Sequence, residues 1–469
     1  GGAGLLNRPR EFFPRPAVAA RTILSLLLAL AAAGCRHPRE VNPPLAAPAG
    51  AEGYYFHTRA RPGNSPDTLF ILCFSGGGTR AAALACGVLE ELARTPVPGT
   101  PRRLLDEVDA ISSVSGGSVT AAAYALYGDE AFGRLETNFL KRDIQGELVG
   151  RVLNPFRWRR LWSPHYNRSD LAAQLYDEVL FHGATFGDLA ARPGPYVAVN
   201  ATDIAHGARF GFSQHQFDLL CADLAPLRVA RAVAASSAVP GLLAPVTLDS
   251  YAGACDPPLP PALLAAARGQ AAGLTRREAL LMRELGGYLG TNRPFLHLMD
   301  GGIADNLGVR AVLDGLHLLM QNPEARGTLD FARLRRVAIL CVNARSQPER
   351  DWNRREAPPG TLALAVAAAG IPMDRYSYET IELLHEQVNA WRDEARRRRG
   401  EAGGPPLELH PIIVSFDQLP DAEERRFFLN QPTSFRLPAG DVDALREVGG
   451  RLLRNAETYQ ALLRDLAAP

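Results

Sequence analysis

The chain has 469 residues, of which 46% are hydrophobic and 22% charged, as expected of a globular protein with one large core or two ordinary ones. The formal net charge is only +1, which argues against a nucleic-acid partner because such proteins carry a strong basic excess. Lys141 is the single lysine of the sequence, so any Schiff-base or Walker-type phosphate mechanism, each of which needs a lysine, would have to use it.

The first 34 residues are typical of an export signal. Four arginines precede an apolar run at 23–33 that is too short to span a bilayer. The run ends in Ala32-Ala33-Gly34-Cys35, which resembles the lipobox of bacterial lipoproteins except that Ala32 replaces the usual leucine. We expect Cys35 to be lipidated and the protein to lie at the outer membrane or the periplasmic face of the bacterial envelope. An ordinary secretory signal or a buried helix are the alternatives.

Residues 35–66 are rich in proline, alanine and glycine and show little periodicity. This composition predicts a disordered tether between the signal at 1–34 and a catalytic body at 67–469.

Two strand–turn–helix units open the body. Continuous apolar runs at 68–74 and 108–114 predict strands buried on both faces, and the spacing of apolar residues predicts helices at 80–94 and 118–128. Ser115 lies at the second of the two turns. Later strands are expected at 196–202, 295–300, 337–343 and 410–416, mostly with helical segments between them. This alternation indicates an α/β layered sheet.

Three other segments are distinctive. Residues 252–293 interrupt two core elements and could form a lid. The stretch "NPFRWRRLW" at 154–162 suits a membrane interface, although an ordinary surface helix with buried tryptophans fits equally well. The cysteines include no Cys-x-x-Cys pair, so we expect no zinc site. Cys221 and Cys255 could form a disulfide in an oxidising compartment.

The turn after the first strand carries Gly76, Gly77 and Gly78, whose backbone could approach a phosphate or an oxyanion closely. The phosphate alternative lacks the third glycine of a dinucleotide motif and the lysine of a Walker motif, because Arg80 stands where that lysine is needed. Ser115, at the neighbouring turn, is the candidate nucleophile that an oxyanion hole requires.

A serine nucleophile needs a base. No histidine has the setting of a triad partner, and His297 inside a strand is interpreted as structural. Asp300 ends the strand at 295–300 and is followed by Gly301 and Gly302, so its carboxylate could reach a serine at a neighbouring strand end.

Together, "SGGGTR" (75–80), "SVSGG" (113–117) and "DGG" (300–302) resemble the motifs of the patatin-like phospholipase family, in the family's order. The resemblance extends to 199–213 and 230–246. It implies a three-layer α/β/α sandwich with a mostly parallel central sheet, and a Ser–Asp dyad that works without histidine.

Carried over by position, the resemblance implies that Ser115 is the nucleophile and Asp300 the base. It also implies that the backbone N–H groups of the glycine loop, with Arg80 nearby, form the oxyanion hole. Gly116, Gly117, Gly301 and Gly302 would support the elbow and the aspartate turn. Two positions depart from the family pattern: Ala81 follows Arg80 where glycine is usual, and Ser113 replaces the first glycine of the elbow.

The resemblance implies a phospholipid or another lipid ester as substrate, a membrane surface as partner, and no metal or other cofactor. The expected activity is that of a phospholipase A or lysophospholipase. The alternatives are a serine esterase of non-phospholipid substrates, which would need a histidine, and a catalytically silent lipid-binding lipoprotein.

Overall fold

The computed structural model describes residues 40–46, 53–58, 63–256, 275–321, 333–349, 351–402 and 407–467. The predicted signal segment and Cys35 lie outside these residues. No helix among the described residues is both long enough and apolar enough to cross a membrane.

Eight strands form one mixed sheet in the order β5-β6-β3-β2-β1-β7-β8, with β4 paired to β3. The strands are β1 (Thr68–Phe74), β2 (Val108–Val114), β3 (Tyr196–Asp203), β4 (Ala208–Phe212), β5 (Val246–Asp249), β6 (Phe295–Asp300), β7 (Arg336–Asn343) and β8 (Glu408–Ser415). Pairings among β3, β2, β1, β7 and β8 are parallel, and β4, β5 and β6 pair antiparallel with their neighbours.

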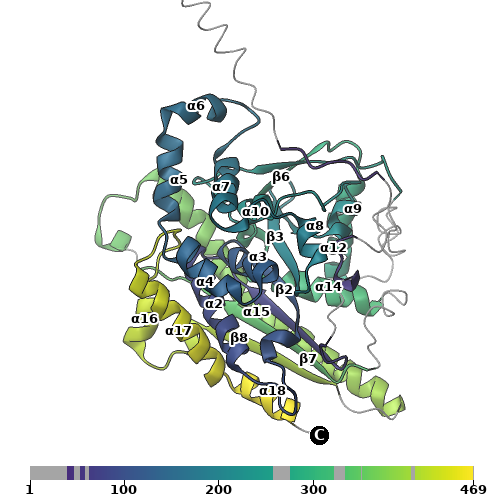
Figure 1. The fold of residues 1–469 in the computed structure, drawn as a ribbon. Helices are drawn as coiled ribbons and strands as arrows, with labels where there is room; N and C mark the ends of the chain where they lie inside the picture. Colours follow the sequence, from purple (N-terminus) through teal and green to yellow (C-terminus); the bar gives the residue numbers. More distant parts are fainter. Residues whose placement is uncertain are drawn as a thin grey trace, which may run out of the picture.

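Helices cover both faces of this sheet (Figure 1). One face is covered by α2 (Gly78–Arg94), α3 (Gly116–Tyr127), α10 (Val229–Ser236) and α17 (Ala439–Asn455), and the other by α14 (Val309–Gln321) and α15 (Thr361–Ala402). The remaining α-helices are α4 (Glu130–Leu135), α5 (Ile144–Leu153), α6 (Pro155–Leu161), α7 (Arg168–Tyr176), α8 (Phe186–Ala191), α9 (Gln214–Asp218), α12 (Arg276–Gly286), α13 (Gly302–Asp305), α16 (Ala422–Leu429) and α18 (Glu457–Ala467). The predicted three-layer fold is confirmed.

The central strands are buried because helices cover them on both sides. All seven residues of β1 are buried, which explains why its sequence is apolar throughout instead of alternating. The free cysteines Cys73 and Cys341 are register partners on β1 and β7 and are fully buried there.

The register of β3 determines where the candidate catalytic residues meet. β3 pairs with β2 up to Asn200 and with β6 from Ala201 onward, while β4 pairs with both parts. Because a strand has only two edges and β4 occupies one, β2 and β6 must lie end to end along the other edge. β2 therefore ends just before Ser115 at the point where β6 ends in Asp300.

Parts of the predicted tether are packed against the body, contrary to the prediction of a disordered segment. The Asn42 side chain is buried and bonds the backbone of Asp249 on β5 in both directions, at 2.8 and 2.9 Å. Tyr54 is also buried, its ring stacking on Tyr196 and its hydroxyl accepting a hydrogen bond from Val197 N. At 40–46 and 53–58, buried aromatic and amide contacts hold the chain against the body, although the composition of the wider segment favours disorder.

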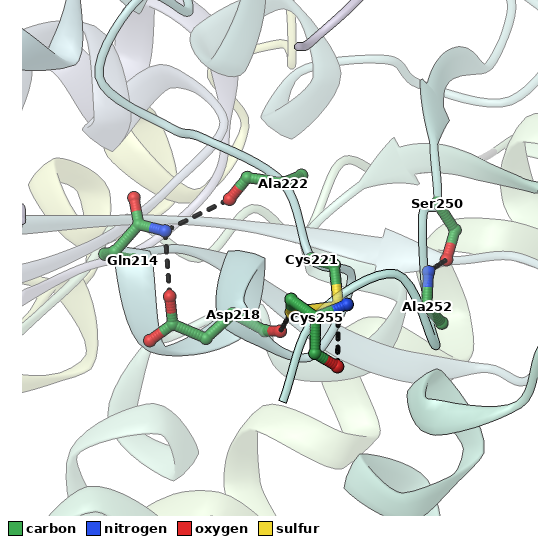
Figure 2. The surroundings of a disulfide bond; sticks show 7 residues. All are labelled: Gln214, Asp218, Cys221, Ala222, Ser250, Ala252 and Cys255. Atoms are coloured by element: carbon green, nitrogen blue, oxygen red, sulfur yellow. Dashed lines mark hydrogen bonds between the residues drawn. A yellow bond between two sulfur atoms is a disulfide. The ribbon is translucent and has the colours of Figure 1, made fainter. Parts of the chain in front are cut away.

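A disulfide between Cys221 and Cys255 fixes the start of the predicted insertion (Figure 2). Beside it, the Gln214 side chain donates hydrogen bonds to the Asp218 carboxylate and to Ala222 O. Residues 257–274 of the insertion lie outside the described part. Its helix α12 is tied to α14 by an ion pair between Arg277 and Asp314 and by a 2.6 Å hydrogen bond between the Glu278 and His317 side chains.

Candidate active site

Ser115 sits in a strained turn between β2 and α3. Its backbone has φ 50° and ψ −120°, a conformation that a residue with a side chain rarely adopts. This is the geometry of a nucleophile elbow, in which a sharp turn presents the serine hydroxyl above the strand end.

The turn is possible because two glycines follow the serine. A Cβ on Gly116 would lie 2.0 Å from Gly78 O, and one on Gly117 would lie 2.7 Å from Ser75 O. The beginnings of α2 and α3 therefore touch through backbone, which brings the glycine loop against the serine. The predicted supporting role of both glycines has a steric explanation.

Ser113 takes the place of the usual elbow glycine without leaving a polar group unsatisfied. It is fully buried, and its hydroxyl donates to Ala198 O on β3 at 3.2 Å. The departure from the family pattern at this position is therefore accommodated by a backbone carbonyl of the neighbouring strand.

Asp300 lies within hydrogen-bonding reach of the serine. The Ser115 hydroxyl lies close enough to its carboxylate to lower its pKa, and Gly302 N donates a hydrogen bond to its Oδ1 at 2.8 Å. Burial raises the pKa of Asp300 from 3.8 to about 6, and Gly302 N–H and the Ser115 hydroxyl act in the opposite direction. A carboxyl group with this pKa is largely ionised at neutral pH and can still take up a proton.

The aspartate turn also depends on close backbone contacts. A Cβ on Gly301 would lie 2.3 Å from Asn200 O, and one on Gly302 would lie 2.2 Å from the Met373 side chain. The Thr202 hydroxyl donates to Asp300 O at 2.8 Å. The two glycines let the turn fit between β3 and α15.

The glycine loop presents two open N–H groups beside the serine. Gly77 and Gly78 have φ of 142° and 61°, and no hydrogen bond between described residues takes up their N–H groups. Gly76 differs from the prediction, because its N–H already donates to Asn306 O at 2.9 Å. The described geometry therefore leaves Gly77 and Gly78, but not Gly76, as candidate oxyanion donors in the loop.

The Arg80 guanidinium lies beside Gly77 of the loop, and its hydrogen bonds go to segments distant in sequence. It is buried, and its guanidinium donates to Ala344 O at 2.9 Å, Gln431 O at 2.6 Å and Thr433 Oγ1 at 3.1 Å. Burial lowers its pKa to about 10, so it stays charged at neutral pH. Arg80 holds the start of α2 against the C-terminal segment and so positions the loop.

Ser236 is a site residue that the sequence analysis did not identify. Its hydroxyl accepts a hydrogen bond from Ser115 N at 2.8 Å and donates to Asn200 O at 2.6 Å. It therefore satisfies the backbone of the strained elbow. Its position falls within 230–246, one of the two stretches to which the family resemblance extends, but no motif marks the serine itself.

Asn306 is the second such residue. Its Oδ1 lies 2.6 Å from the position of a Cβ on Gly76 and 2.8 Å from that of a Cβ on Gly302. Two glycines of the site thus make room for one amide side chain, which lies between the loop and the aspartate turn.

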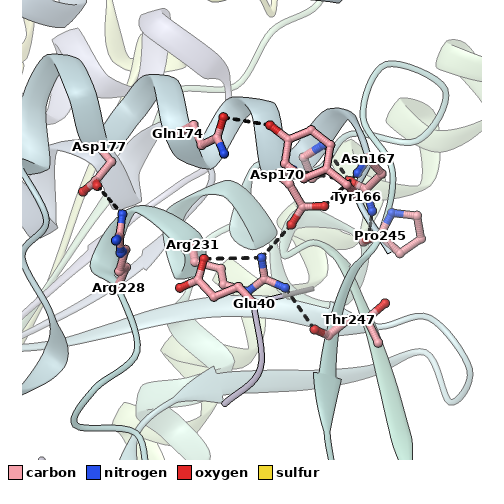
Figure 3. A network of polar contacts seen from close by, with 11 residues as sticks. Glu40, Tyr166, Asn167, Asp170, Gln174, Asp177, Arg228, Arg231, Pro245 and Thr247 are labelled. Carbon is pink, nitrogen blue, oxygen red and sulfur yellow. Dashed lines mark hydrogen bonds and ion pairs between the residues drawn. The ribbon is translucent and has the colours of Figure 1, made fainter. Parts of the chain in front are cut away.

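The helix that carries Ser236 is anchored by a buried arginine (Figure 3). Arg231 on α10 is 2% exposed and pairs with Asp170 on α7 at 2.6 Å, and it donates to Thr247 O on β5 at 3.2 Å. Glu40, in the packed part of the predicted tether, lies 3.9 Å from the same guanidinium. These contacts fix α10 behind the elbow.

Within the described part of the chain, no histidine hydrogen-bonds to Ser115 or Asp300. His297 instead contacts the Thr247 hydroxyl at 3.0 Å, on the two antiparallel strands β5 and β6. No group of three or more His, Cys, Asp or Glu side chains suited to a metal ion occurs among the described residues.

Comparison with known proteins agrees with these motifs. The sequence profile described as patatin-like phospholipase matches residues 72–313, more than half of the chain. No curated protein sequence matches it significantly.

Among solved structures, human GIVD cytosolic phospholipase A2 is similar, with a TM-score of 0.43 and 14% identity, over 86% of this chain and 62% of that one. VipD from Legionella pneumophila has a TM-score of 0.24 and 11% identity, over 88% of this chain and 71% of that one. This chain thus spans less than two thirds of the human protein. On the extent of the profile match, the chain belongs to the patatin-like phospholipase family.

Proposed function

We propose that the chain is a serine lipid acyl hydrolase of the phospholipase A or lysophospholipase type, working through a Ser115–Asp300 dyad. The observation that carries this proposal is a strained serine directly beside a buried aspartate, Asp300, whose pKa is raised to about 6. A base with a pKa near neutrality combines ionisation with the ability to return its proton.

In the proposed first half-reaction, Ser115 Oγ attacks the ester carbonyl carbon and its proton passes to the Asp300 carboxylate. The carbonyl oxygen becomes an oxyanion, which the N–H groups of Gly77 and Gly78 would stabilise. Collapse of the tetrahedral intermediate breaks the carbon–oxygen bond of the ester. Asp300 gives its proton to the departing alcohol, and the acyl group remains on Ser115.

In the second half-reaction, water attacks the acyl-enzyme and loses its proton to Asp300. A second tetrahedral oxyanion forms at the same N–H groups. Its collapse releases the fatty acid, and the proton returns to Ser115 Oγ. The cycle consumes one water molecule per ester and needs no redox partner.

The first test is labelling with a fluorophosphonate probe, followed by mass spectrometry of the labelled peptide. We expect the label on Ser115, strongly reduced labelling in Asp300→Asn, and retained labelling in Ser113→Gly, which restores the usual elbow glycine. A wild-type protein that is not labelled in the presence of lipid vesicles would support the silent lipid-binding alternative. Labelling that survives Asp300→Asn but depends on a histidine would support the esterase alternative.

The substrate class is then assigned by comparing a diacyl phospholipid, a lysophospholipid and a short-chain ester. Preferential hydrolysis of the first two is expected for the proposed function. Exclusive hydrolysis of the short-chain ester would contradict it.

We also propose that the protein is exported and lipidated at Cys35 in the bacterial cell envelope. The Cys221–Cys255 disulfide supports export, since such bonds persist in oxidising compartments. Metabolic labelling with a radioactive fatty acid should mark the wild type and not Cys35→Ser. Equal labelling of both would contradict the proposal.

A further inference from the structure

Helices α5 and α6 project from the body as residues 144–162, which we call the α5–α6 arm (Figure 1). Several large apolar side chains of this arm are exposed. Phe156 is 92% exposed, Leu153 and Trp162 are each 66% exposed, and Val149 and Trp158 are 51% and 42% exposed. Single exposed apolar residues are ordinary, but five within fourteen positions form a patch that needs an explanation.

The arm is ordered by its own contacts. Pro155 begins α6 directly after Asn154, whose side chain accepts a hydrogen bond from Phe156 N at 3.0 Å. The Trp158 indole donates to Val152 O at 3.0 Å, and its ring lies 6.4 Å from that of Trp162. Contacts within the arm therefore help to hold these aromatic side chains in their exposed positions.

The charged residues at the tip of the arm, helix α6, are all basic. The α6 sequence "PFRWRRL" contains three arginines and no acidic residue. Glu147, lower on α5, is paired with Arg142, and Arg151 is paired with Glu178. The sequence of α6 thus gives the tip a net positive charge beside its exposed aromatic residues.

This combination fits an anionic lipid surface. Tryptophan and phenylalanine rings favour the boundary between headgroups and acyl chains, and arginine side chains beside them bind lipid phosphates. Each basic residue near an anionic leaflet adds to the attraction.

The foot of the arm touches the segment that supports the glycine loop. Gln145 N donates to Phe435 O at 3.2 Å, and Ser434 Oγ donates to Gln145 Oε1 at 2.8 Å. The carbonyl of Ser434 in turn accepts a hydrogen bond from Thr79 N at 2.9 Å. The ten residues of α5 extend about 15 Å from this point, so the foot of the arm contacts the loop's support while α6 lies about 15 Å away.

We propose that the tip of the α5–α6 arm docks the protein on an anionic phospholipid surface. Phe156 and Trp162 enter the headgroup region, and Arg157 binds lipid phosphate. The inference rests on the proposed function in one respect only: docking would serve to bring the candidate active site to the lipid ester. Binding itself does not depend on catalysis.

The test is flotation of the full chain with vesicles. All proteins carry Cys35→Ser, so that lipidation does not mask the surface, and Ser115→Ala, so that the vesicles stay intact. Vesicles of phosphatidylcholine alone are compared with vesicles that also contain phosphatidylglycerol. We expect binding that requires phosphatidylglycerol and that weakens roughly tenfold or more when Phe156→Ser and Trp162→Ser are combined.

Two matched controls accompany this pair. Phe427→Ser removes a ring that is 43% exposed on α16 and should leave binding unchanged. Arg157→Gln should weaken binding to anionic vesicles, whereas Arg396→Gln, an exposed arginine on α15, should not.

Retained binding in the Phe156→Ser and Trp162→Ser protein, or binding indifferent to phosphatidylglycerol, would overturn the proposal and leave the patch for a protein partner. Activity separates this result from failure of the proposed function. With Ser115 intact, the same arm variants should hydrolyse a dispersed short-chain ester at the wild-type rate. If the wild type hydrolyses no ester, the proposed function fails, and the flotation result still decides the docking surface.

Discussion

The backbone conformation of Ser115 is strained, and contacts with its neighbours hold it in place. A residue with a side chain at φ 50° costs on the order of 1–3 kcal/mol and persists only where surrounding contacts fix it. Here the fixing contacts are the Ser236 hydroxyl on Ser115 N and the glycines that follow. The strain orients the hydroxyl toward Asp300 before any substrate binds.

Removing the Ser236 hydroxyl should therefore disturb the elbow. In Ser236→Ala the buried N–H of Ser115 loses its partner, which costs about 1–3 kcal/mol of stability. We expect a lower kcat with a nearly unchanged KM, and slower fluorophosphonate labelling. Ser237→Ala is the matched control, since that hydroxyl donates to Val233 O at 2.7 Å and, among the described residues, has no hydrogen bond to Ser115. Equal rates in the two variants would argue against the positioning role.

The pKa of Asp300 predicts the pH profile of activity. As a base the carboxylate must be ionised, so kcat/KM on an uncharged ester should fall as the pH drops below about 6 and reach a plateau above it. Asp300→Asn should lower the plateau by roughly 10²–10⁴-fold. A profile that stays flat down to the ordinary carboxyl range would contradict the assignment.

The same pKa predicts a gain in stability on losing the charge. The folded-state pKa of about 6 lies above the ordinary value of 3.8, so the folded state binds the proton more tightly. Ionisation therefore destabilises the fold progressively as pH rises through this window, by up to about 3 kcal/mol. At neutral pH, Asp300→Asn should unfold at a higher temperature than the wild type. This difference should vanish in acid, and identical melting temperatures at neutral pH would contradict the argument.

At the scale of elements, the contact between the first turns of α2 and α3 tolerates no side chain. Gly116→Ala would place Cβ 2.0 Å from Gly78 O. Neither atom can move away by a side-chain rotation, because each is fixed by the backbone, so the two helices must separate. We expect a loss of stability of about 1–3 kcal/mol or more, together with loss of labelling at Ser115. Gly133→Ala on α4 is the control, because its Cβ meets open space and alanine favours the helix. Thermal unfolding of both variants measures the difference.

The strands that carry the site were predictable from sequence because they are strongly apolar and bounded by glycine. The predicted 68–74, 108–114 and 295–300 match β1, β2 and β6. The short β4 and β5 were not predicted, since four or five residues carry too little pattern. The end-to-end arrangement of β2 and β6 also could not be read from sequence, because it depends on which edge of β3 each strand occupies.

At the site, the family motifs identified the serine, the aspartate and the glycine loop. They did not show that Gly76 N–H is occupied or that the Arg80 guanidinium binds the C-terminal segment, because both depend on segments distant in sequence. The partners are Asn306 and the 431–433 stretch.

At the scale of the whole molecule, the Cys221–Cys255 bond joins residues 34 positions apart and closes the chain around β5. A disulfide over such a loop contributes about 2–4 kcal/mol. Reduction, or Cys255→Ser, should lower the melting temperature while leaving activity on a short-chain ester measurable below the transition. A melting temperature that is the same with and without reductant would contradict the presence of the bond.

Because β2 and β6 meet end to end, the distance between the proposed catalytic residues Ser115 and Asp300 depends on the integrity of the sheet. Neither Ser115 nor Asp300 is carried by a long loop, and their relation depends on both strands keeping register on β3. A slip of one residue would turn a side chain to the opposite face. Activity should therefore resist fraying at the periphery and disappear together with the sheet, so that inactivation and global unfolding follow one temperature curve.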